Sequence, residues 1–420
     1  MTRYRARWVL PIDQPPLRDG WVDVADGRIA GLGAGTAPGP AAADTRDLGE
    51  VALVPGLVNA HTHLELSWMA GLVPPAASMH EWIGALMRVR FAGPKMGSGR
   101  ISDDGTGNAA RPHFPEPDAA RAGAALMRGT GTVLVGDITN SLITPPILAE
   151  AGIGGVVFHE LLGFSVSEPH AFVRAAAGRA SAAAAGVANA EPPIRVTLAA
   201  HAPYSVSPAL FREIAAQASG PLAVHLGESP EEVEFLRSGL GPIRQTLESL
   251  GVWNGEWRVP ECDPVSYIAD LGYLQPGALV VHGVHLTDDA LERLRDADAT
   301  LITCPRSNLW VGAGPPRLSH FYACGVPVAV GTDSLASVAT LNLWDELAEM
   351  RRLAPDVAPE CLLESATRIG AEALGFGDDF GTLTAGKRAA LVAVDVPAAV
   401  GDVEEYLVSG VPADCVRRVA

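Results

Sequence analysis

Short apolar runs recur along most of the chain, and each is followed by polar residues and then by a helix-like segment. The runs contain Val, Leu, Ile and Ala without alternation, which is typical of parallel strands buried on both faces. Amphipathic stretches such as Ala209–Ala218 and Leu341–Leu353 predict helices that cover these strands. Eight runs fit the pattern: Leu53–Val58, Thr132–Val135, Gly155–Phe158, Ile194–Ala199, Pro221–Val224, Ala278–Val281, Thr300–Thr303 and Pro327–Val330.

Eight β/α units in succession predict an α/β fold, a (β/α)8 barrel of the TIM type, over residues 53–376. In such a barrel the reactive groups collect at the carboxyl ends of the strands. The polar residues that follow the runs are therefore the first place to look for chemistry.

Both chain ends carry strand-like pieces outside this repeating pattern. The stretches 6–10, 21–25 and 28–32 are separated by the turn dipeptides Asp19-Gly20 and Asp26-Gly27, and a further run occupies 389–394. We expect residues 1–52 and 377–420 to form one small β-sandwich beside the barrel.

The segment Gly93–Pro117 is rich in Gly, Pro, Ser and Asp and has no apolar period. A loop of this length inside a compact domain is usually either functional or disordered. Two interpretations stay open, a lid over the barrel mouth and a disordered insertion.

The composition restricts the classes of partner. The 420 residues are 48% hydrophobic and 19% charged, and their net charge of −17 gives a surface that repels nucleic-acid phosphates and anionic lipid. We therefore expect no nucleic acid and no membrane as partner, while a homodimer stays open. The five cysteines include no C-x-x-C pair, and Pro11, Asp13 and Pro15 interrupt the N-terminal apolar stretch. Free thiols and a cytoplasmic location follow as expectations.

The first run ends in His61-Thr-His63, which places two imidazoles at positions i and i+2. In a strand both side chains point to the same face, which inside a barrel is the lumen. Two neutral imidazoles at a strand end suit a borderline divalent ion such as zinc. An isolated H-x-H is weak evidence, but its position directly after a buried strand strengthens the interpretation.

Other runs end in ionisable residues as well. His225 and Glu228 follow the fifth run, His282 the sixth and Asp333 the eighth. Each histidine alone could equally be a hydrogen-bonded core residue, and Asp333 alone a helix N-cap. Together with the H-x-H pair, these residues would bring four strand ends of one barrel to the same place. This convergence favours a metal site over the structural roles.

Taken together, these residues resemble the amidohydrolase superfamily, and within it the aminohydrolase branch of nucleobase, nucleoside and triazine deaminases and chlorohydrolases. The resemblance covers nearly the whole chain, although the closing segment has Ala390 where the family usually has an acidic residue. It is carried by Pro55–His63, His201–Ser205, His225–Glu228, His282, Ser307-Asn308, Gly331–Ser334 and Gly381–Lys387.

The resemblance implies a ligand set and a group of proton-transfer residues. A divalent ion would be bound by the side chains of His61, His63, His225 and Asp333. Glu228 would protonate a ring nitrogen and His282 would stabilise the attacking water, while Asp333 shares the proton of that water. The reaction implied is hydrolytic deamination of an amino-substituted N-heterocycle by a metal-bound hydroxide.

The number of metal ions follows from the lysines. Many binuclear members of the superfamily bridge two ions with a carboxylated lysine, and the only lysines here are Lys95 and Lys387, neither of which is placed to reach the centre. Glu160 could bridge instead, but a structural or substrate-side carboxylate is the preferred interpretation. We expect one ion, with zinc ahead of iron, because both suit three histidines and one aspartate.

The substrate is the least determined part of the prediction. The sequence segments His61–Ser67 and His225–Ser229 most resemble those of family members that act on the aminopurine nucleoside aminodeoxyfutalosine. Alternatives are dechlorination of a chloro-heterocycle at the same centre, hydrolysis of a cyclic amide, and a metal-binding protein without activity. Contacts to the heterocycle are expected from side chains at the fourth and seventh strand ends, which could otherwise be loop structure or a cap: His201, Tyr204, Arg306 and Asn308.

Overall fold

The computed structural model describes residues 1–36, 44–91, 117–253 and 255–420, so most of the segment 93–117 lies outside the described residues. Two four-stranded parallel sheets form the centre of the molecule. The first contains β6 (Leu57–Thr62), β7 (Thr132–Thr139), β8 (Gly154–Leu161) and β9 (Ile194–Ala200). The second contains β10 (Ala223–Leu226), β11 (Leu279–His282), β12 (Thr300–Thr303) and β13 (Val328–Val330). Each of the eight strands falls on or overlaps one of the apolar runs.

Backbone contacts join the two sheets at both edges. Between β9 and β10, the backbone N–H of His225 donates to the carbonyl of His201 at 2.9 Å. Between β13 and β6, Thr62 pairs with Asp333 in parallel fashion, and the N–H of Asp333 donates to the carbonyl of His61 at 3.0 Å. These contacts lie at the carboxyl ends of the strands, so the residues that follow them are brought together.

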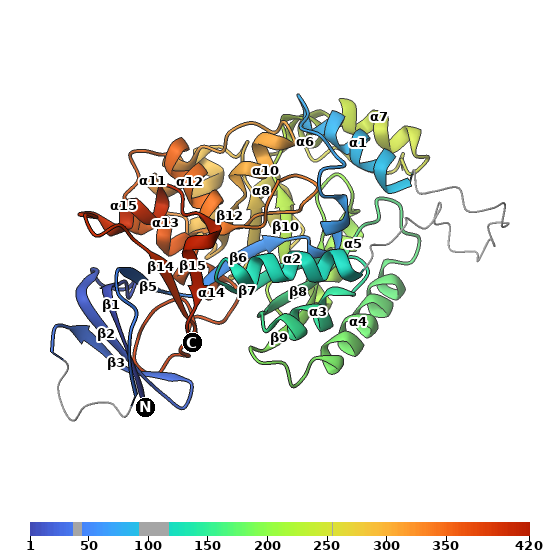
Figure 1. Ribbon diagram of the computed structural model, residues 1–420. Helices are drawn as coiled ribbons and strands as arrows, with labels where there is room; N and C mark the ends of the chain where they lie inside the picture. Colours follow the sequence, from blue (N-terminus) through green and yellow to red (C-terminus); the bar gives the residue numbers. More distant parts are fainter. Residues whose placement is uncertain (37–43, 92–116, 254) are drawn as a thin grey trace.

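Helices cover the outer side of the two sheets (Figure 1). Many begin with proline in the first turn, where its missing N–H costs no hydrogen bond. The expected helices appear as α5, capped by Ser207, and α12, capped by Asn342. The helices are α1 (Met79–Phe91), α2 (Pro117–Gly129), α3 (Thr144–Ala151), α4 (Pro169–Gly186), α5 (Pro208–Gln217), α6 (Pro230–Ser238), α7 (Pro242–Ser249), α8 (Pro264–Asp270), α9 (Asp288–Asp296), α10 (Pro305–Trp310), α11 (Leu318–Ala323), α12 (Leu343–Leu353), α13 (Pro359–Ser365), α14 (Arg368–Ala373) and α15 (Val403–Val408), with 3-10 turns η1 (Leu64–Met69) and η2 (Ala413–Cys415).

Strands from both chain ends form a third sheet beside this centre (Figure 1). It is one seven-stranded sheet in the order β15-β14-β5-β1-β2-β3, with β4 also paired to β1. Two facing sheets, as a sandwich requires, are not found in the described part of the chain. The strands are β1 (Thr2–Val9), β2 (Leu17–Ala25), β3 (Arg28–Ala34), β4 (Asp44–Asp47), β5 (Val51–Pro55), β14 (Leu391–Asp395) and β15 (Val416–Arg418).

The first apolar run, expected as a single strand, divides between two sheets. Val51–Pro55 is β5 of the terminal sheet, whereas Leu57–Thr62 is β6 of the first parallel sheet. Gly56 separates them, and a Cβ at this position would lie 2.4 Å from Cγ1 of Val133. An unbroken apolar run gives no sign of such a division, because both strands are buried.

None of the described helices is long and apolar enough to cross a membrane.

Candidate metal centre and active site

Three imidazoles converge where β6 and β10 end. His61 lies near the end of β6 and His63 directly follows the strand. Their Nε2 atoms lie 3.2 Å apart. The Nε2 atom of His225, from β10, lies 3.3 Å from each of them. Two nitrogens bound to one zinc ion at tetrahedral angles would be about 3.3–3.4 Å apart. The spacing of the three nitrogens therefore fits a single shared divalent ion.

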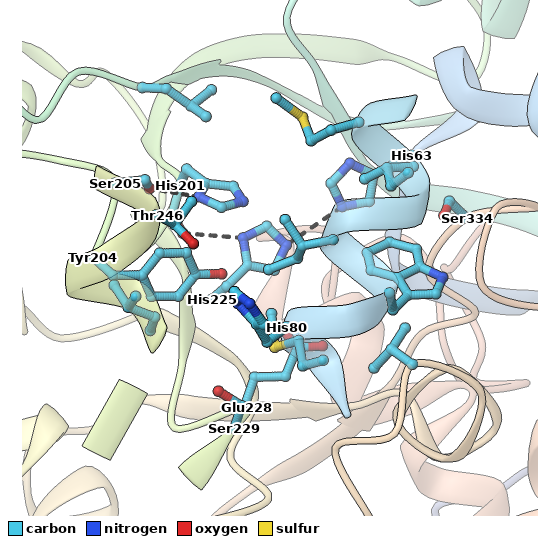
Figure 2. A pocket seen from close by; sticks show the side chains of 18 of the residues that line it. His63, His80, His201, Tyr204, Ser205, His225, Glu228, Ser229, Thr246 and Ser334 are labelled. Atoms are coloured by element: carbon cyan, nitrogen blue, oxygen red, sulfur yellow. Dashed lines mark hydrogen bonds between the residues drawn. The ribbon is translucent and has the colours of Figure 1, made fainter. Parts of the chain in front are cut away.

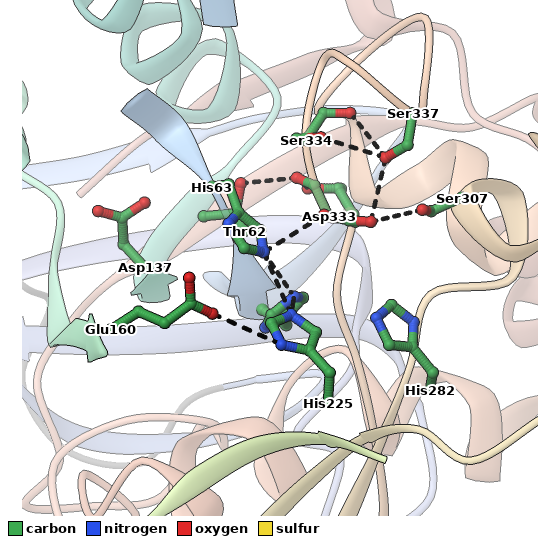
Figure 3. Close-up of polar contacts among 12 residues, drawn as sticks. Thr62, His63, Asp137, Glu160, His225, His282, Ser307, Asp333, Ser334 and Ser337 are labelled. Atoms are coloured by element: carbon green, nitrogen blue, oxygen red, sulfur yellow. Dashed lines mark hydrogen bonds and ion pairs between the residues drawn. The ribbon is translucent and has the colours of Figure 1, made fainter. Parts of the chain in front are cut away.

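The remaining ring nitrogen of His225 is already used. Its Nδ1 lies 3.0 Å from the carbonyl oxygen of His201 and donates to it, which leaves the lone pair on Nε2. Glu160 Oε1 lies 3.6 Å from the same Nδ1 (Figure 3). A backbone carbonyl behind a histidine is the usual device that orients a metal-binding ring.

Asp333 completes the group from the residue after β13. One of its oxygens, Oδ2, accepts hydrogen bonds from Ser307 at 2.5 Å and Ser337 at 3.0 Å (Figure 3). The other, Oδ1, lies 3.6 Å from Nε2 of His63. The two serines fix the carboxylate so that its free oxygen faces the histidines, and His61, His63 and Asp333 form one of the compact groups able to hold a metal ion.

Burial keeps the histidines in the form that binds a metal. It lowers the pKa of His63 to about 3 and that of His225 to about 4, with neighbouring charges adding smaller effects. Burial, followed by His63 and His225, lowers the pKa of His61 well below its usual value. At neutral pH the rings are therefore uncharged, and their donor atoms fit a divalent ion.

Glu228 and His282 lie beside this group. Oε1 of Glu228 is 3.6 Å from Nε2 of His282, and both side chains are almost fully buried. Burial and then the charges of Asp333 and Glu232 raise the pKa of Glu228 well above its ordinary value. A carboxyl group that keeps its proton at neutral pH can act as a general acid.

His282 is held from behind by Asn308, whose side-chain amide Nδ2 donates to Nδ1 of the ring at 3.0 Å. This contact places the ring proton on Nε2, toward Glu228. His282 and Asp333 both have positive φ, 76° and 61°, which is uncommon for residues that carry a Cβ and is concentrated at functional sites.

Glu232 positions Glu228, a role that the sequence analysis did not identify. Its carboxylate accepts from the backbone N–H of Gly227 at 2.9 Å and of Glu228 at 3.2 Å. Ser229 Oγ in turn accepts from the N–H of Glu232 at 3.3 Å. The signal was present, because Ser229-Pro-Glu-Glu232 has the spacing of a capping box.

The metal-binding group opens into a cavity of about 280 Å³ (Figure 2). His63, His225, Glu228, His282 and Asp333 form its floor, and α1 and α7 contribute apolar side chains to its wall. Both helices lie at the end of the molecule away from the terminal sheet (Figure 1). These two helices as walls were not anticipated, since only the following segment 93–117 was interpreted as a lid.

The four expected substrate residues divide into two pairs. His201 and Tyr204 line the cavity, and His201 Nδ1 lies 2.6 Å from the hydroxyl oxygen of Ser205. Asn308 does not line it, because its amide is used behind His282.

Arg306 also lies outside the cavity lining, contrary to expectation. Its guanidinium donates to the carbonyl and hydroxyl of Thr340 and forms ion pairs with Asp345 and Glu346, all at 3.2–3.5 Å. The proline at 305 starts helix α10 and turns the arginine toward α12 instead of the strand ends. Arg306 is therefore a structural ion-pair residue.

Polar residues at the ends of the first three parallel strands, Glu65, Asn140 and Glu160, add a further part of the lining. Glu65 accepts from the hydroxyl of Thr139 at 2.7 Å and from the N–H groups of Asn140 and Ser141 at 2.9 and 3.0 Å. Asn140 Nδ2 donates to Oε2 of Glu160 at 3.1 Å.

The two lysines of the chain were not expected to reach the metal-binding group. Lys387 donates its Nζ proton to the carbonyl of Phe380, and Lys95 lies outside the described residues.

The chain is similar to several known proteins. An aminodeoxyfutalosine deaminase from Deinococcus radiodurans is 31% identical over 341 residues, which cover 77% of this chain and 73% of that protein. A 5-methylthioadenosine/S-adenosylhomocysteine deaminase from Moorella thermoacetica is 29% identical over 409 residues, 92% of this chain and 84% of that protein. The crystal structure of an adenosine deaminase from Xanthomonas campestris with bound zinc has a TM-score of 0.77 at 24% identity, and the match covers 99% and 90% of the two chains. The family model described as "Amidohydrolase family" matches residues 52–419, and the chain belongs to this family.

Proposed function

We propose that the two parallel sheets are the halves of one (β/α)8 barrel and that the terminal sheet forms a separate small β-domain. The backbone contacts at His225 and at Asp333 join the sheets at both edges. The division of the first apolar run at Gly56 supports a boundary between the two parts at that residue. The site then occupies the carboxyl-terminal face, the position that barrel enzymes use.

The barrel would hold one divalent ion, zinc, at His61, His63, His225 and Asp333. Support comes from the mutual spacing of the three Nε2 atoms and from the two serines that orient Asp333. No lysine of the described chain reaches this group to bridge a second ion. A bound ion of this kind would supply a water that is deprotonated near neutral pH.

The reaction that fits best is hydrolytic deamination of an aminopurine nucleoside. The observation that carries it is the position of Glu228, which is buried on the cavity floor between the metal-binding residues and His282. Glu228 would donate its proton to a ring nitrogen, which makes the adjacent amino-bearing carbon electrophilic. His282, fixed by Asn308, would donate a hydrogen bond to the oxygen that adds to that carbon. Water would add to that carbon and give one proton to Asp333. The C–N bond would break as the C=O bond forms, ammonia would leave with the proton from Asp333, and the second proton of the water would return to Glu228.

The relatives support the same substrate class, because both named deaminases act on aminopurine nucleosides. Dechlorination would use the same residues and differ only in the leaving group. Cyclic amide hydrolysis has no need of a proton donor at Glu228.

A substrate panel tests the proposal. Zinc-loaded protein is incubated with aminopurine nucleosides, amino- and chloro-triazines and cyclic amides, and released ammonia, released chloride and ring opening are measured. We expect ammonia from an aminopurine nucleoside and none from the same protein with His225→Ala. Chloride release or ring opening without ammonia would replace deamination by one of the alternatives, and no product from any compound would favour a binding protein.

A further inference from the structure

A buried carboxyl group of α12 lies against the first turn of α10. Glu346 is fully buried, and its Oε2 accepts from the backbone N–H of Arg306 at 3.2 Å. Its Oε1 lies 3.5 Å from the guanidinium of the same residue and has no hydrogen bond in the described chain. Glu346 therefore contacts both the backbone and the side chain of Arg306.

The first turn of α10 lacks a capping side chain of its own. Cys304 occupies the N-cap position without a side-chain hydrogen bond to the helix, and Pro305 has no N–H to offer. A helix of six residues is too short to be stable by itself, so contacts with other elements fix its place. The carboxyl group of Glu346 supplies, from another helix, the acceptor that an N-cap residue usually supplies.

The next two residues of α10 hold two groups of the active site. The hydroxyl of Ser307 donates to Oδ2 of Asp333 at 2.5 Å (Figure 3). The amide of Asn308 donates to Nδ1 of His282 at 3.0 Å, and both Ser307 and Asn308 are fully buried. A shift of the first turn would therefore move the supports of a metal-binding carboxylate and of the histidine beside Glu228 together.

Glu346 does not touch these groups itself. The described lining of the cavity does not include it. The guanidinium of Arg306 also contacts Thr340 and Asp345, so it keeps partners without Glu346. The backbone N–H of Arg306, in contrast, has no other acceptor in the described chain. The backbone contact is therefore the one for which Glu346 has no substitute.

We propose that Glu346 is a positioning residue for Asp333 and His282, and that it acts through the first turn of α10. The inference rests on the proposed function for its effect on the metal, and on the contact between Asn308 and His282 alone for its effect on the ring. Residues behind metal ligands change metal affinity or activity about 10–100-fold when they are replaced.

Matched variants separate this role from a general loss of stability. Glu346→Met removes the acceptor of the backbone N–H together with the ion pair, whereas Arg306→Met removes the ion pair alone. Glu346→Gln keeps an acceptor oxygen at the same place. Glu346→Asp keeps the carboxyl group but shortens its reach, and it gives the same test as Glu346→Met if that protein does not fold.

Three measurements are made on each variant. Zinc affinity is determined by chelator competition, and thermal unfolding shows whether the protein is folded. Nitrogen-15 NMR of the histidine rings in metal-free protein reports which nitrogen of His282 carries the proton, and the signal is identified by its absence from His282→Gln. The contact with Asn308 predicts the proton on Nε2 in the unsubstituted protein.

Glu346→Met should weaken zinc binding about 10–100-fold and leave the ring proton of His282 divided between both nitrogens, whereas Glu346→Gln and Arg306→Met should keep the affinity and the Nε2 proton. When Ser307→Ala is already present, Glu346→Met should weaken zinc binding much less, because the contact through which it acts is gone.

Unchanged zinc affinity and an unchanged His282 ring in folded Glu346→Met, or equal losses in Arg306→Met, would overturn the assignment. A His282 ring that depends on Glu346 in a protein that binds no zinc would support Glu346 and reject the metal site. Zinc binding and ammonia release that do not respond to Glu346→Met, with an unchanged ring, would do the reverse.

Discussion

Replacement of Glu228 by glutamine separates the proton donor from the metal-binding group. The pKa of Glu228 is raised well above its ordinary value, mainly by burial, which favours the protonated carboxyl group that a general acid requires. Glutamine has nearly the same shape and is also neutral, but it cannot deliver a proton to a ring nitrogen. The substitution should therefore leave metal and substrate binding intact and abolish the proton transfer to the ring nitrogen.

The expected loss follows from the role of a general acid. Such a group contributes about 10²–10⁴ in rate, or about 3–5 kcal/mol of barrier at about 1.4 kcal/mol per tenfold. The loss should appear in kcat with little change in KM, because the proton is transferred only in the transition state. Folding should not suffer, since burial disfavours the charged form of Glu228 and the replacing amide carries no charge.

The assay compares metal content, thermal unfolding, kcat and KM of Glu228→Gln with those of Glu234→Gln. Glu234 is an exposed residue of α6, the helix that begins two residues after Glu228, and serves as the control. A Glu228→Gln protein with metal bound and nearly normal kcat would remove Glu228 from the mechanism. Loss of the metal would instead show that Glu228 supports the binding site.

Three further outcomes follow from particular contacts. Ser307→Ala removes the 2.5 Å hydrogen bond to Asp333 and should weaken zinc binding about 10–100-fold in chelator competition; the control is Ser319→Ala, which removes a hydrogen bond to Asp356 outside the cavity lining, and an unchanged affinity would contradict the orienting role. Arg306→Met should lower the free energy of unfolding by about 1–3 kcal/mol without changing KM, because Arg306 pairs with buried Glu346, and a changed KM at unchanged stability would restore it as a substrate residue. Burial raises the pKa values of Asp137 and Glu232 to about 7, so the folded state holds their protons; the stability they contribute is complete below their unfolded pKa values and is lost as pH rises through 7. The unfolding temperature of metal-free protein should decrease as the pH rises from about 5 to 8. Asp137→Asn should make this decrease less steep, whereas an equally steep decrease would contradict the assignment.

The sequence predicted most of the parallel strands and the convergence of the residues at their ends. This was possible because unbroken apolar runs identify buried strands, and because parallel strands carry their following residues to one edge. His61, His63, His225 and Asp333 lie together for that reason. The same logic does not say which way a side chain turns once a helix begins. Arg306 contacts Thr340 and the acidic residues of α12, Asn308 contacts the back of the His282 ring, and neither lines the cavity.

Other features depend on contacts between segments distant in the chain. The division of the first run at Gly56 reflects the close approach of Val133. The walls supplied by α1 and α7 reflect how helices pack over the strand ends, which periodicity alone does not give. Glu232 could have been identified from the sequence, because its capping-box spacing with Ser229 is local.

The central claim is that one divalent ion, held by His61, His63, His225 and Asp333, makes this chain a deaminase. The most direct measurement is a titration of metal-free protein with zinc, with bound metal and ammonia release from an aminopurine nucleoside recorded at each point. The account predicts that activity is absent without metal and rises in proportion to bound zinc up to one equivalent per chain. Full activity in metal-free protein, or activity that appears only with a second equivalent, would contradict it.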